Sequence, residues 1–354
     1  MLQLTSTKRP VEVSYPLLAG RAYIVGQKIG DITFPNDETI MRFHAELEVE
    51  HPLGNLVDPN LTPTLDVTDI GSNAGIFATE VNIRRKFAVA HSQKVTLSIG
   101  DLICFGTTTG ENEFRVNYMS LVVVPSSSVD ISLDFKNRIA QLGGYFMKKW
   151  NARATHLVMD EITLTVKVVA ALLAAKPIVT PAYITELLVA YAKADNPERE
   201  LPNPKNFLPP VAVYKIRDPS KKFNDAVFYP NTARTMLLIG KTFLFGSKQH
   251  LKSLKSAITA GGGNAQLLVD ATEMNILSGD YIIMGHPKDI EKAEENPTVR
   301  ILIDVYKSLN KRFVRDEELG WAALSSSIEK FCNPDFRNQN AQTVPNQYRM
   351  ETIE

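Results

Sequence analysis

Several features are scarce in this sequence of 354 residues, and each absence narrows what the chain can be. Cysteine occurs only as Cys104 and Cys332, both among apolar neighbours. We therefore expect buried thiols in a reducing compartment, with neither a disulfide framework nor a metal site. No apolar run approaches the ~20 residues of a membrane helix, and the N-terminus lacks a signal-peptide pattern, so we expect a soluble intracellular protein without membrane partners.

Net charge is also lacking, because 39 Lys and Arg residues face 39 Asp and Glu residues. Proteins that grip bare DNA usually carry a basic excess or stripe. Local basic spots such as Arg84-Arg85-Lys86 and Lys148-Lys149 are more typical of solvated surface. The charge balance therefore argues against strong direct DNA binding.

Motifs for catalysis and nucleotide binding are absent as well. No Gly-x-Gly-x-x-Gly follows a strand, and Gly240-Lys241-Thr242 leads into a strand where a phosphate loop would lead into a helix. The six histidines are scattered, and no nucleophile with a nearby histidine, no metal-ligand spacing and no paired carboxylates stand out. We expect no enzyme activity and no cofactor.

The chain is long enough for two or three domains with sizeable cores. Up to about residue 118 it contains short strand-like runs at nearly regular spacing, separated by Gly, Asn, Asp and Pro, which predicts an all-β sandwich. The expected strands are the runs 23–25, 32–34, 45–50, 65–67, 75–77, 95–97, 102–105 and 113–116.

The stretch 126–191 reads as one compact α/β module. Phe135, Ile139 and Leu142 form one face of a helix that ends at Gly143-Gly144. We expect a buried strand at 155–159, a helix at 165–175, a strand at 178–179, and a helix that Thr180 caps and Pro181 begins.

A polar, proline-punctuated stretch from about 194 to 230 predicts a semi-extended linker. The α/β pattern then returns, with expected strands at 236–239, 242–245 and 281–284. Leu251, Leu254, Ala257 and Ile258 form a helical face that stops at 261–263. A further helix begins at Pro297 after the cap Asn296 and buries Val299, Leu302, Ile303 and Tyr306.

Specific residues add a family resemblance to these patterns. The resemblance to a first BRCT repeat is carried by residues 141–144, Trp150, 155–159 and 176–179. A second BRCT repeat is indicated by residues 240–245 and 261–263. The N-terminal region resembles an FHA domain through the following residues: Val25-Gly26, Asp31-Ile32, Arg42-Phe43-His44-Ala45, Asp69, Ser72, Gly75 and Gly100-Asp101. Together the modules resemble the nibrin family, over roughly residues 20 to 335.

This resemblance implies a multidomain fold class, in which an all-β FHA sandwich is followed by two three-layer α/β BRCT repeats with parallel sheets. The expected domains are the FHA domain 1–118, BRCT repeat 1 at 119–195, the linker 196–232, BRCT repeat 2 at 233–335 and a C-terminal extension 336–354.

FHA domains bind phosphothreonine through loops at one end of the sandwich, and the resemblance places Gln27, Met41, Arg42, Ser72 and Asn73 there. Gln27 and Met41 stand where the family has Arg and Ser, and Ala74 replaces a loop Asn. Because a charge-assisted hydrogen bond contributes about 1.5–3 kcal/mol, we expect a site weakened roughly ten- to a hundred-fold. His44 is expected to brace the loop and not to bind ligand.

A phosphoserine dianion needs a hydroxyl, a backbone N–H and a cation aimed at one point. In BRCT repeats these groups follow the first strand, stand at the Gly-Gly turn and stand near a helix N-terminus, where the macrodipole also favours an anion. The resemblance assigns them to Ser126 or Ser127, to Gly144 and to Lys167. The second repeat lacks a matching Thr-x-Lys and is expected to pack beside the first as one wall of the peptide groove.

The implied function is a nuclear, chromosome-associated scaffold that recruits phosphorylated repair and checkpoint proteins to DNA double-strand breaks. Its implied partners also include the break-repair nuclease, the ATPase subunit of that nuclease and a checkpoint kinase. The degenerate FHA loop leaves a second interpretation open, in which all three domains are purely structural protein-interaction modules.

Overall fold

The computed structural model describes residues 1–9, 11–107, 111–192, 200–212 and 224–337. They form two compact units that do not follow chain order. The first unit comprises Met1–Val123, Asp130–Met147 and Pro181–Asn203, and the second comprises Val124–Val129, Lys148–Thr180 and the chain from Pro204 onward. The expected linker 196–232 and extension 336–354 lie partly outside the described residues.

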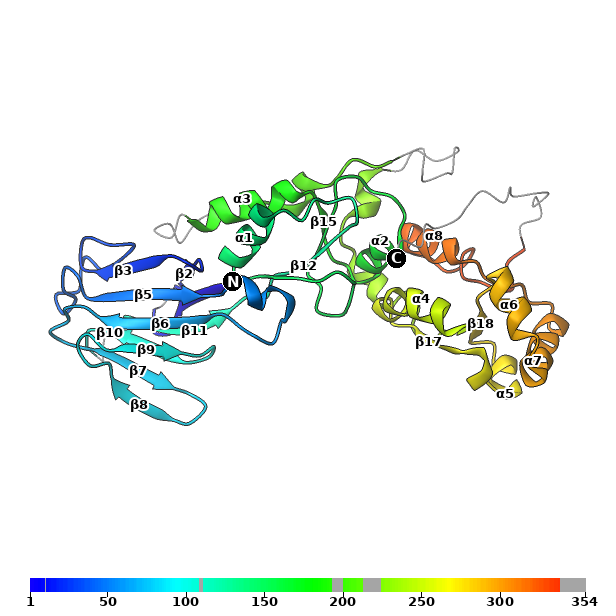
Figure 1. The fold of residues 1–354 in the computed structure, drawn as a ribbon, viewed down its shortest axis with the longest axis horizontal. Coiled ribbons are helices and arrows are strands. Elements are labelled where there is room, and N and C mark those ends of the chain that lie inside the picture. The colour runs from blue at the N-terminus through cyan, green and yellow to red at the C-terminus, as the bar shows by residue number, and fades with distance from the viewer. Residues whose placement is uncertain (10, 108–110, 193–199, 213–223, 338–354) are drawn as a thin grey trace. The chain divides into compact units, whose positions relative to one another are not determined.

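The first unit contains a sandwich of two sheets (Figure 1). One sheet has six antiparallel strands in the order β2-β1-β11-β10-β7-β8. Its strands are β1 (Leu2–Ser6), β2 (Ser14–Leu17), β7 (Ile76–Glu80), β8 (Arg85–Ala88), β10 (Leu102–Phe105) and β11 (Glu113–Tyr118). The other has five strands in the order β4-β3-β5-β6-β9. They are β3 (Ala22–Gly26), β4 (Ile32–Thr33), β5 (Ala45–Glu50), β6 (Thr64–Asp69) and β9 (Lys94–Leu97).

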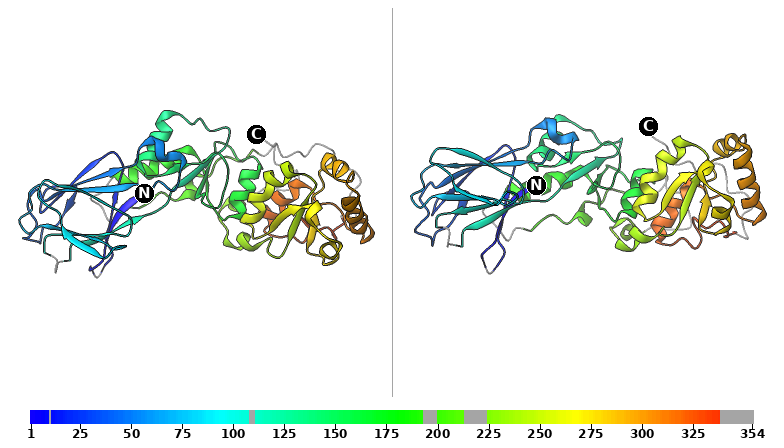
Figure 2. Two further views of the ribbon diagram at one scale, coloured as in Figure 1. Left: turned by 60° about the horizontal axis from the view of Figure 1, so that its bottom comes forward. Right: turned by 90° about the horizontal axis from the view of Figure 1, so that it is seen from below.

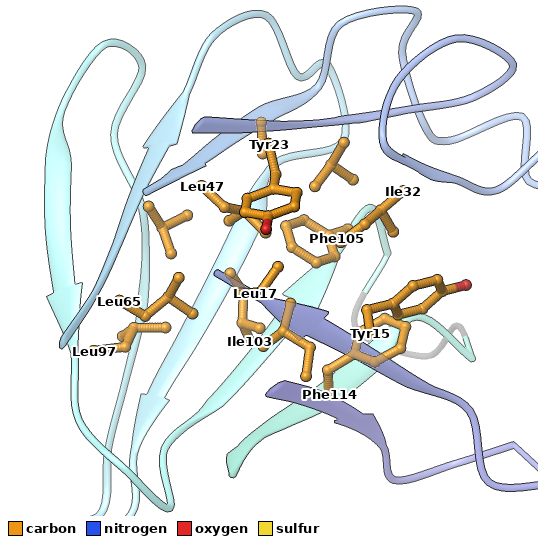
Figure 3. Packing of buried hydrophobic residues seen from close by; sticks show 14 of the residues in the cluster. Tyr15, Leu17, Tyr23, Ile32, Leu47, Leu65, Leu97, Ile103, Phe105 and Phe114 are labelled. Atoms are coloured by element: carbon orange, nitrogen blue, oxygen red, sulfur yellow. The ribbon is translucent and has the colours of Figure 1, made fainter. Parts of the chain in front are cut away.

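The sandwich core lies between the two sheets, where alternate residues of each strand meet. On β5, Ala45, Leu47 and Val49 are buried while the residues between them are half-exposed, which is the period of two expected for a sheet with one buried face. Figure 3 shows Leu47 and Tyr23 of one sheet packed toward Phe105, Ile103 and Phe114 of the other. Apolar burial on this scale is what stabilises a sandwich.

Two helices and a short strand pack on this sandwich within the first unit. They are α1 (Leu133–Gln141), β13 (Tyr145–Phe146) and α3 (Pro181–Ala192), and α1 packs against η1 (Leu53–Val57) and α3. His51 Nε2 contacts Gly144 O at 2.9 Å, and the Tyr118 hydroxyl donates to Gly143 O at 2.8 Å. The Tyr145 hydroxyl donates back to Leu61 O at 3.1 Å. These reciprocal bonds join the sandwich to the start of the α/β module without a flexible tether.

Strand β12 (Val122–Pro125) belongs to both units. Val122 and Val123 pair in parallel with β13, and the chain then enters the second unit, where the Ser126 N–H donates to Val158 O. The sheet has the order β13-β12-β14-β15, with β14 (His156–Val158) and β15 (Ile178–Val179) also parallel. The carboxyl ends of these strands therefore meet at one edge, which is where the candidate site lies.

Helix α2 (Val166–Leu173) links the α/β module to the second repeat. Its apolar side packs against α4 (Lys248–Ala260) and α8 (Asp316–Ser325). A Cβ on Gly261 would lie 3.2 Å from Leu173 Cδ2, and one on Gly320 would lie 2.6 Å from Leu164 Cδ2. Glycine at these two positions lets the helices approach closely, so α2 is held on a rigid support.

The second repeat has a three-stranded parallel sheet in the order β17-β16-β18. Its helices and strands, green-yellow to orange in Figure 2, enclose a core of buried aliphatic and aromatic residues that includes Leu244, Ile303 and Tyr306. The remaining elements are η2 (Pro204–Phe207), η3 (Asp225–Phe228), η4 (Thr232–Met236), β16 (Thr242–Phe245), β17 (Asn264–Leu267), η5 (Leu268–Asp270), α5 (Glu273–Leu277), β18 (Tyr281–Ile283), α6 (Pro287–Ala293) and α7 (Pro297–Ser308).

Most expected elements are confirmed within a residue or two, including the Asn296 cap, whose side chain accepts from the backbone N–H groups of Thr298 and Val299. The strand expected at 236–239 is wrong. Met236 ends a 3-10 helix and 237–240 form turns, closed by Gly240 at φ +77°. Only Leu238 of this run is buried, while Met236 and Ile239 are exposed. The prediction was wrong because it took a short apolar run for a buried strand.

Candidate functional site

Three loops meet at one end of the sandwich, where the sequence predicts a phosphothreonine site. The Gln27 N–H donates to Met41 O at 3.0 Å, which ties the loop after β3 to the loop before β5. Gly26 is needed there, since a Cβ would lie 2.3 Å from the carbonyl oxygens of both Arg42 and Ile29. The loop after β6 joins them, because a Cβ on Gly71 would lie 3.0 Å from Phe43 O.

His44 holds these loops together from inside. It is fully buried; the Met41 N–H donates to Nδ1 at 3.1 Å, and Nε2 lies 3.2 Å from Gly75 O. Since Nδ1 accepts, the proton belongs on Nε2, which donates to Gly75 O. Burial lowers the pKa of His44, which keeps the ring neutral. The prediction that His44 braces the loop is confirmed.

Two neutral side chains of this loop end have protein partners. Gln27 Nε2 donates to Asp37 O at 3.4 Å, and the Ser72 hydroxyl donates to Asp69 Oδ2. Burial opposes ionisation of Asp69, but the hydrogen bonds from Ser72 and Gly71 together outweigh it and lower the Asp69 pKa. A ligand phosphate would have to compete with this carboxylate for the Ser72 proton, which weakens the loop as an anion site.

The remaining predicted residues of the loop end differ in what they offer. Arg42 is exposed, with its guanidinium carbon 5.4 Å from the centre of the Phe43 ring. Asn73 is exposed and Met41 is half-buried. Among the described residues, no carboxylate or carbonyl accepts a hydrogen bond from the Arg42 side chain. Arg42 is therefore the described cation of this loop end without a hydrogen-bond acceptor, and its role in anion binding stays a prediction.

The second candidate site lies where β12 ends. Lys167 Nζ donates to Pro125 O at 2.7 Å, so the ammonium stands beside the carbonyl that immediately precedes Ser126. Thr165 caps α2 by accepting from the Val168 N–H at 3.4 Å, and Lys167 lies in the first turn. The structure thus brings together two segments that the sequence predicts from positions about forty residues apart.

Lys167 is half-buried, and burial lowers its pKa. Desolvation of an ammonium by its surroundings disfavours the charged form, and an anion beside it would restore that form. Only one of its three N–H bonds has a partner among the described residues, namely Pro125 O. Two donors of the ammonium are left for a ligand.

The serine run after β12 contributes more than the two serines that the sequence singles out. Ser126 Oγ and Ser128 Oγ are 2.7 Å apart, so one hydroxyl donates to the other. Ser127 and Ser128 are exposed. Within the described ranges, the backbone N–H groups of Ser127 and Ser128 have no hydrogen-bond acceptor. Ser128 was missed by sequence reasoning, although three consecutive serines at a strand end were its signal.

Gly144 lies in the first unit, at the end of α1. Its N–H donates to Ile139 O at 2.8 Å and its carbonyl oxygen faces His51 Nε2. Both of its backbone polar groups are therefore engaged in closing the helix and joining it to the sandwich. Gly144 remains an untested member of the predicted site, and the donor that it was expected to supply is already in use.

The corresponding serine of the second repeat has a structural task. Ser247 follows β16 and caps α4, with its Oγ accepting from the His250 N–H at 3.2 Å. His250 is itself buried between Asp289 and Asp316, 3.2 Å and 2.8 Å away. Lysines do stand in the first turns of neighbouring helices, Lys248 in α4 and Lys288 in α6, but among the described residues neither side chain donates a hydrogen bond to the segment after β16.

The described residues contain neither a metal-binding cluster nor a membrane-spanning helix. No group of three or more His, Cys, Asp and Glu side chains is placed to hold a metal ion. No described helix is both long and apolar enough to cross a membrane. Cys104 and Cys332 are both buried and unpaired, as the sequence predicts.

Comparison with known proteins gives the same domain order. The model of the BRCA1 C Terminus (BRCT) domain matches residues 118–188, and that of the second BRCT domain on Nijmegen syndrome breakage protein matches 232–334. The structure of the S. pombe Nbs1 FHA-BRCT1-BRCT2 domains superposes with a TM-score of 0.54 and 15% identity, over 88% of this chain and 99% of that one. The Nbs1 chain in the structure of the S. pombe Nbs1-Ctp1 complex gives 0.52 and 16%, over 87% and 98%.

These matches define the class: an FHA sandwich followed by two BRCT repeats, which confirms the predicted fold class. Nibrin of Mus musculus is 32% identical over 330 residues, which cover 90% of this chain and 41% of nibrin. Nibrin of Gallus gallus is 30% identical over 334 residues, covering 92% and 42%. The chain belongs to the nibrin family, and it spans about 41% of the length of the mouse relative.

Proposed function

We propose that this chain is a phosphopeptide-binding scaffold of the DNA double-strand-break repair and checkpoint machinery, with its main phosphate pocket formed by Ser126, Ser127 and Lys167. The observation that carries the proposal is the bond from Lys167 Nζ to Pro125 O, which holds the cation beside the serine run. Membership of the nibrin family supplies the biological setting.

The chemistry of this corner suits a phosphate dianion. Lys167 offers charge and two unused N–H donors, while the exposed residues Ser127 and Ser128 offer backbone N–H groups that have no acceptor among the described residues. The N-terminus of α2 adds a positive electrostatic potential on the same side as the Lys167 ammonium. One hydroxyl of the pair Ser126 and Ser128 donates to the oxygen of the other. The accepting hydroxyl keeps its own proton, which it can donate to the ligand.

The sandwich supplies a second and weaker phosphate site in this proposal. Arg42 is its available cation, and the engagement of Ser72 and Gln27 with Asp69 and Asp37 supports low affinity for phosphothreonine. The domain boundaries after 118, 195, 232 and 335 are part of the same proposal.

The partners follow from the family. The solved complex names Ctp1 as a partner of S. pombe Nbs1. We propose that phosphorylated repair and checkpoint proteins bind this chain, and that the break-repair nuclease, the ATPase subunit of that nuclease and a checkpoint kinase belong to its assembly. In this proposal the protein acts in the nucleus, on chromosomes, as a non-enzymatic adaptor without strong direct DNA binding.

Calorimetric titration tests the pocket, using phosphorylated and unphosphorylated versions of one serine-containing repair-protein peptide. Lys167→Met removes one charge-assisted bond and should weaken binding of the phosphorylated peptide by about 1.5–3 kcal/mol, or roughly ten- to a hundred-fold. Lys149→Met, at an exposed lysine in the same unit, is the matched control and should change binding little.

The purely structural interpretation predicts a different result. It is favoured by one observation, namely that the FHA hydroxyl and amide donors are tied to Asp69 and Asp37. If wild-type protein bound both versions of the peptide equally, the phosphate pocket would be absent and this alternative would stand. A loss confined to Lys167→Met with unchanged urea unfolding would support the pocket and exclude a folding defect.

A further inference from the structure

One edge of the six-stranded sheet is formed by β8 (Arg85–Ala88), the last strand in the order β2-β1-β11-β10-β7-β8. Figure 1 shows β8 at the border of the sandwich beyond β7. Within the described residues, no strand pairs with the other side of β8. An edge strand presents unpaired backbone N–H and C=O groups, and these can pair with an extended segment of another chain.

The register with β7 shows which backbone groups of β8 are free. The Val89 N–H donates to Ile76 O at 2.8 Å, so the backbone groups of Val89 point toward β7. Bonded and non-bonded pairs alternate along an antiparallel ladder. Phe87 therefore also points its backbone groups toward β7, whereas Lys86 and Ala88 point theirs away from it. The N–H and C=O groups of Lys86 and Ala88 are available to an added strand.

The opposite edge of the same sheet, at β2, lacks this opportunity. The Ser6 N–H donates to Val13 O at 2.8 Å. By the same alternation the backbone groups of Tyr15 point toward β1, whereas those of Pro16 point away from it. Proline has no N–H and is a common means of blocking a sheet edge. Strand β8 contains no proline, so its edge is not blocked in this way.

The charges along β8 favour an acidic partner. Arg84 and Lys86 are exposed, and no described carboxylate pairs with either side chain. Arg85 is already paired, because its Nε lies 2.9 Å from Glu80 Oε2. The edge therefore keeps two unpaired cations. They would repel the same edge of a second copy of this chain and attract glutamate or aspartate side chains on an added strand.

The core side of β8 has apolar surface that a partner can cover. Phe87 is only half-buried, although it packs against the sandwich core. The Arg85 guanidinium carbon lies 4.8 Å from the centre of the Phe87 ring and covers part of it. Since side chains alternate along a strand, Phe87 and Val89 face the core, whereas Lys86 faces solvent. An added strand of alternating apolar and acidic residues would cover Phe87 and meet Lys86.

We propose that β8 binds an extended acidic segment of a partner protein, which joins the six-stranded sheet as an additional antiparallel strand. Backbone hydrogen bonds to Lys86 and Ala88 hold the segment, and its alternation of apolar and acidic side chains selects it. The antiparallel direction follows the rest of this sheet. The inference is independent of both phosphate sites, because it requires neither a phosphate nor Lys167.

Fluorescence polarisation with the full chain tests the chemistry of the partner. The probe is a labelled peptide of alternating valine and glutamate, compared with valine-threonine and valine-lysine peptides of the same length. The valine-glutamate peptide should bind several-fold more tightly than the valine-threonine peptide, and the valine-lysine peptide should bind most weakly. The reason is that opposite charges on neighbouring strands attract and like charges repel.

N-methylation of the valine-glutamate peptide tests the added strand itself, because it removes backbone donors from one side of the peptide at a time. In an antiparallel pair, the residue opposite Lys86 has its side chain on the same face as Lys86 and exchanges both backbone bonds with it. That residue is a glutamate of the probe. N-methylation of the glutamate nitrogens should therefore weaken binding about ten-fold, whereas N-methylation of the valine nitrogens should change it little.

On the protein side, Ala88→Pro removes an N–H that points away from β7, so it should weaken binding of the valine-glutamate peptide about ten-fold. Lys86→Glu should weaken the valine-glutamate peptide and strengthen the valine-lysine peptide, a reversal that a folding defect would not produce. Lys28→Glu makes the same charge change at the exposed loop end and should change both little. Lys167→Met should also leave both peptides bound.

The reversal by Lys86→Glu decides the question if Ala88→Pro fails to fold, which urea unfolding shows. Equal binding of the valine-glutamate and valine-threonine peptides, equal effects of the two sets of N-methyl groups, or equal effects of Lys86→Glu and Lys28→Glu would each overturn the proposal. A duplex oligonucleotide is the last probe. If it bound in a manner that Lys86→Glu abolished, while the valine-glutamate peptide did not bind, the edge would be a nucleic-acid surface and the proposal would be wrong.

Discussion

The loop end of the sandwich and the corner at the end of β12 hold the same kinds of groups in opposite states. At the loop end the cation is exposed, and the hydroxyl of Ser72 is bound to Asp69. At the corner Lys167 is half-buried at a helix N-terminus, and no described carboxylate pairs with it. Water and salt screen an exposed charge strongly, whereas a partly buried one keeps more of its interaction energy.

The comparison therefore shows that residues of the right type are not enough for a phosphate site. Their donor groups must also be free to bind the ligand. Arg42 and Ser72 are retained in the loop, yet one hydrogen bond removes the hydroxyl as a donor. Lys167 donates one of its three N–H bonds to Pro125 O, and that hydrogen bond positions the ammonium beside the serines. Two of the three N–H bonds remain for a ligand of the proposed site.

The largest expected effect comes from the support beneath Lys167. Leu173 is fully buried on the side of α2 that packs against α4, with its Cδ2 near Gly261. Leu173→Ala should lower the free energy of unfolding by about 2–5 kcal/mol, because it removes buried methyl groups and leaves a cavity. It should also weaken phosphoserine-peptide binding, while leaving phosphothreonine-peptide binding at the loop end unchanged.

Urea unfolding and hydrogen exchange over α2 measure this effect. Val189→Ala is the control, since Val189 is 47% exposed on α3 and should cost less than about 0.5 kcal/mol. A loss of stability below 1 kcal/mol for Leu173→Ala, or equal loss of both binding activities, would show that the support of α2 does not distinguish the sites.

A smaller effect is expected from restoring charge to the loop end. Gln27 is half-buried beside Met41 and holds Asp37 O only through a long bond of 3.4 Å. Gln27→Arg adds a second guanidinium near Arg42 and should tighten phosphothreonine-peptide binding by about ten-fold, the low end for a charge-assisted bond. Titration of one phosphothreonine peptide measures it, with Lys86→Arg as a charge-neutral control on the exposed strand β8.

If wild-type protein already bound that peptide at submicromolar affinity, and Gln27→Arg changed nothing, the loop end would be an intact phosphate site. The contrast between the two sites would then be lost.

The parts of this fold that could be predicted are those marked by local signals in the sequence, such as hydrophobic periodicity and helix caps. The alternation Ala45, Leu47, Val49 and the cap Asn296 before Pro297 are local signals, and both are confirmed. Strands β1, β2 and β8 of the sandwich were missed. Strand β8 is almost entirely exposed at the sheet edge, so it has no apolar alternation to detect. Strand β1 pairs with β11, more than a hundred residues away, and sequence alone does not give that register.

The candidate sites follow the same division. Residue identity marks Lys167 and the serines, because the cap Thr165 places a lysine in the first turn of a helix. The hydrogen-bond partners of the site residues could not be predicted, because they depend on which acceptor lies nearest after folding. The engagement of Gly144 by Ile139 O and of Ser72 by Asp69 are both of this kind.

The smallest expected effect is a pH dependence at the loop end. Burial lowers the pKa of His44 below its ordinary value of 6.5. On acidification the unfolded chain therefore takes up the proton before the folded one does, so the stability of the loop end falls as pH drops below 6.5. One group contributes at most about 1.4 kcal/mol per pH unit. The proton would enter at Nδ1, which accepts from the Met41 N–H, so this bond should break first.

Hydrogen exchange between pH 7.5 and 5.5 reads this locally, after correction for the intrinsic pH dependence of exchange. The amides of Met41 and Ile70 should lose protection at the lower pH, since both are bonded to His44. The Ser126 N–H, which is bonded to Val158 O, should keep its protection. Burial also lowers the pKa values of His51 and His156, and the readout at the Met41 and Ile70 amides separates these histidines from His44, to which both amides are bonded. Unchanged protection at Met41 would mean that His44 stays neutral throughout this range and that the two sites respond alike to pH.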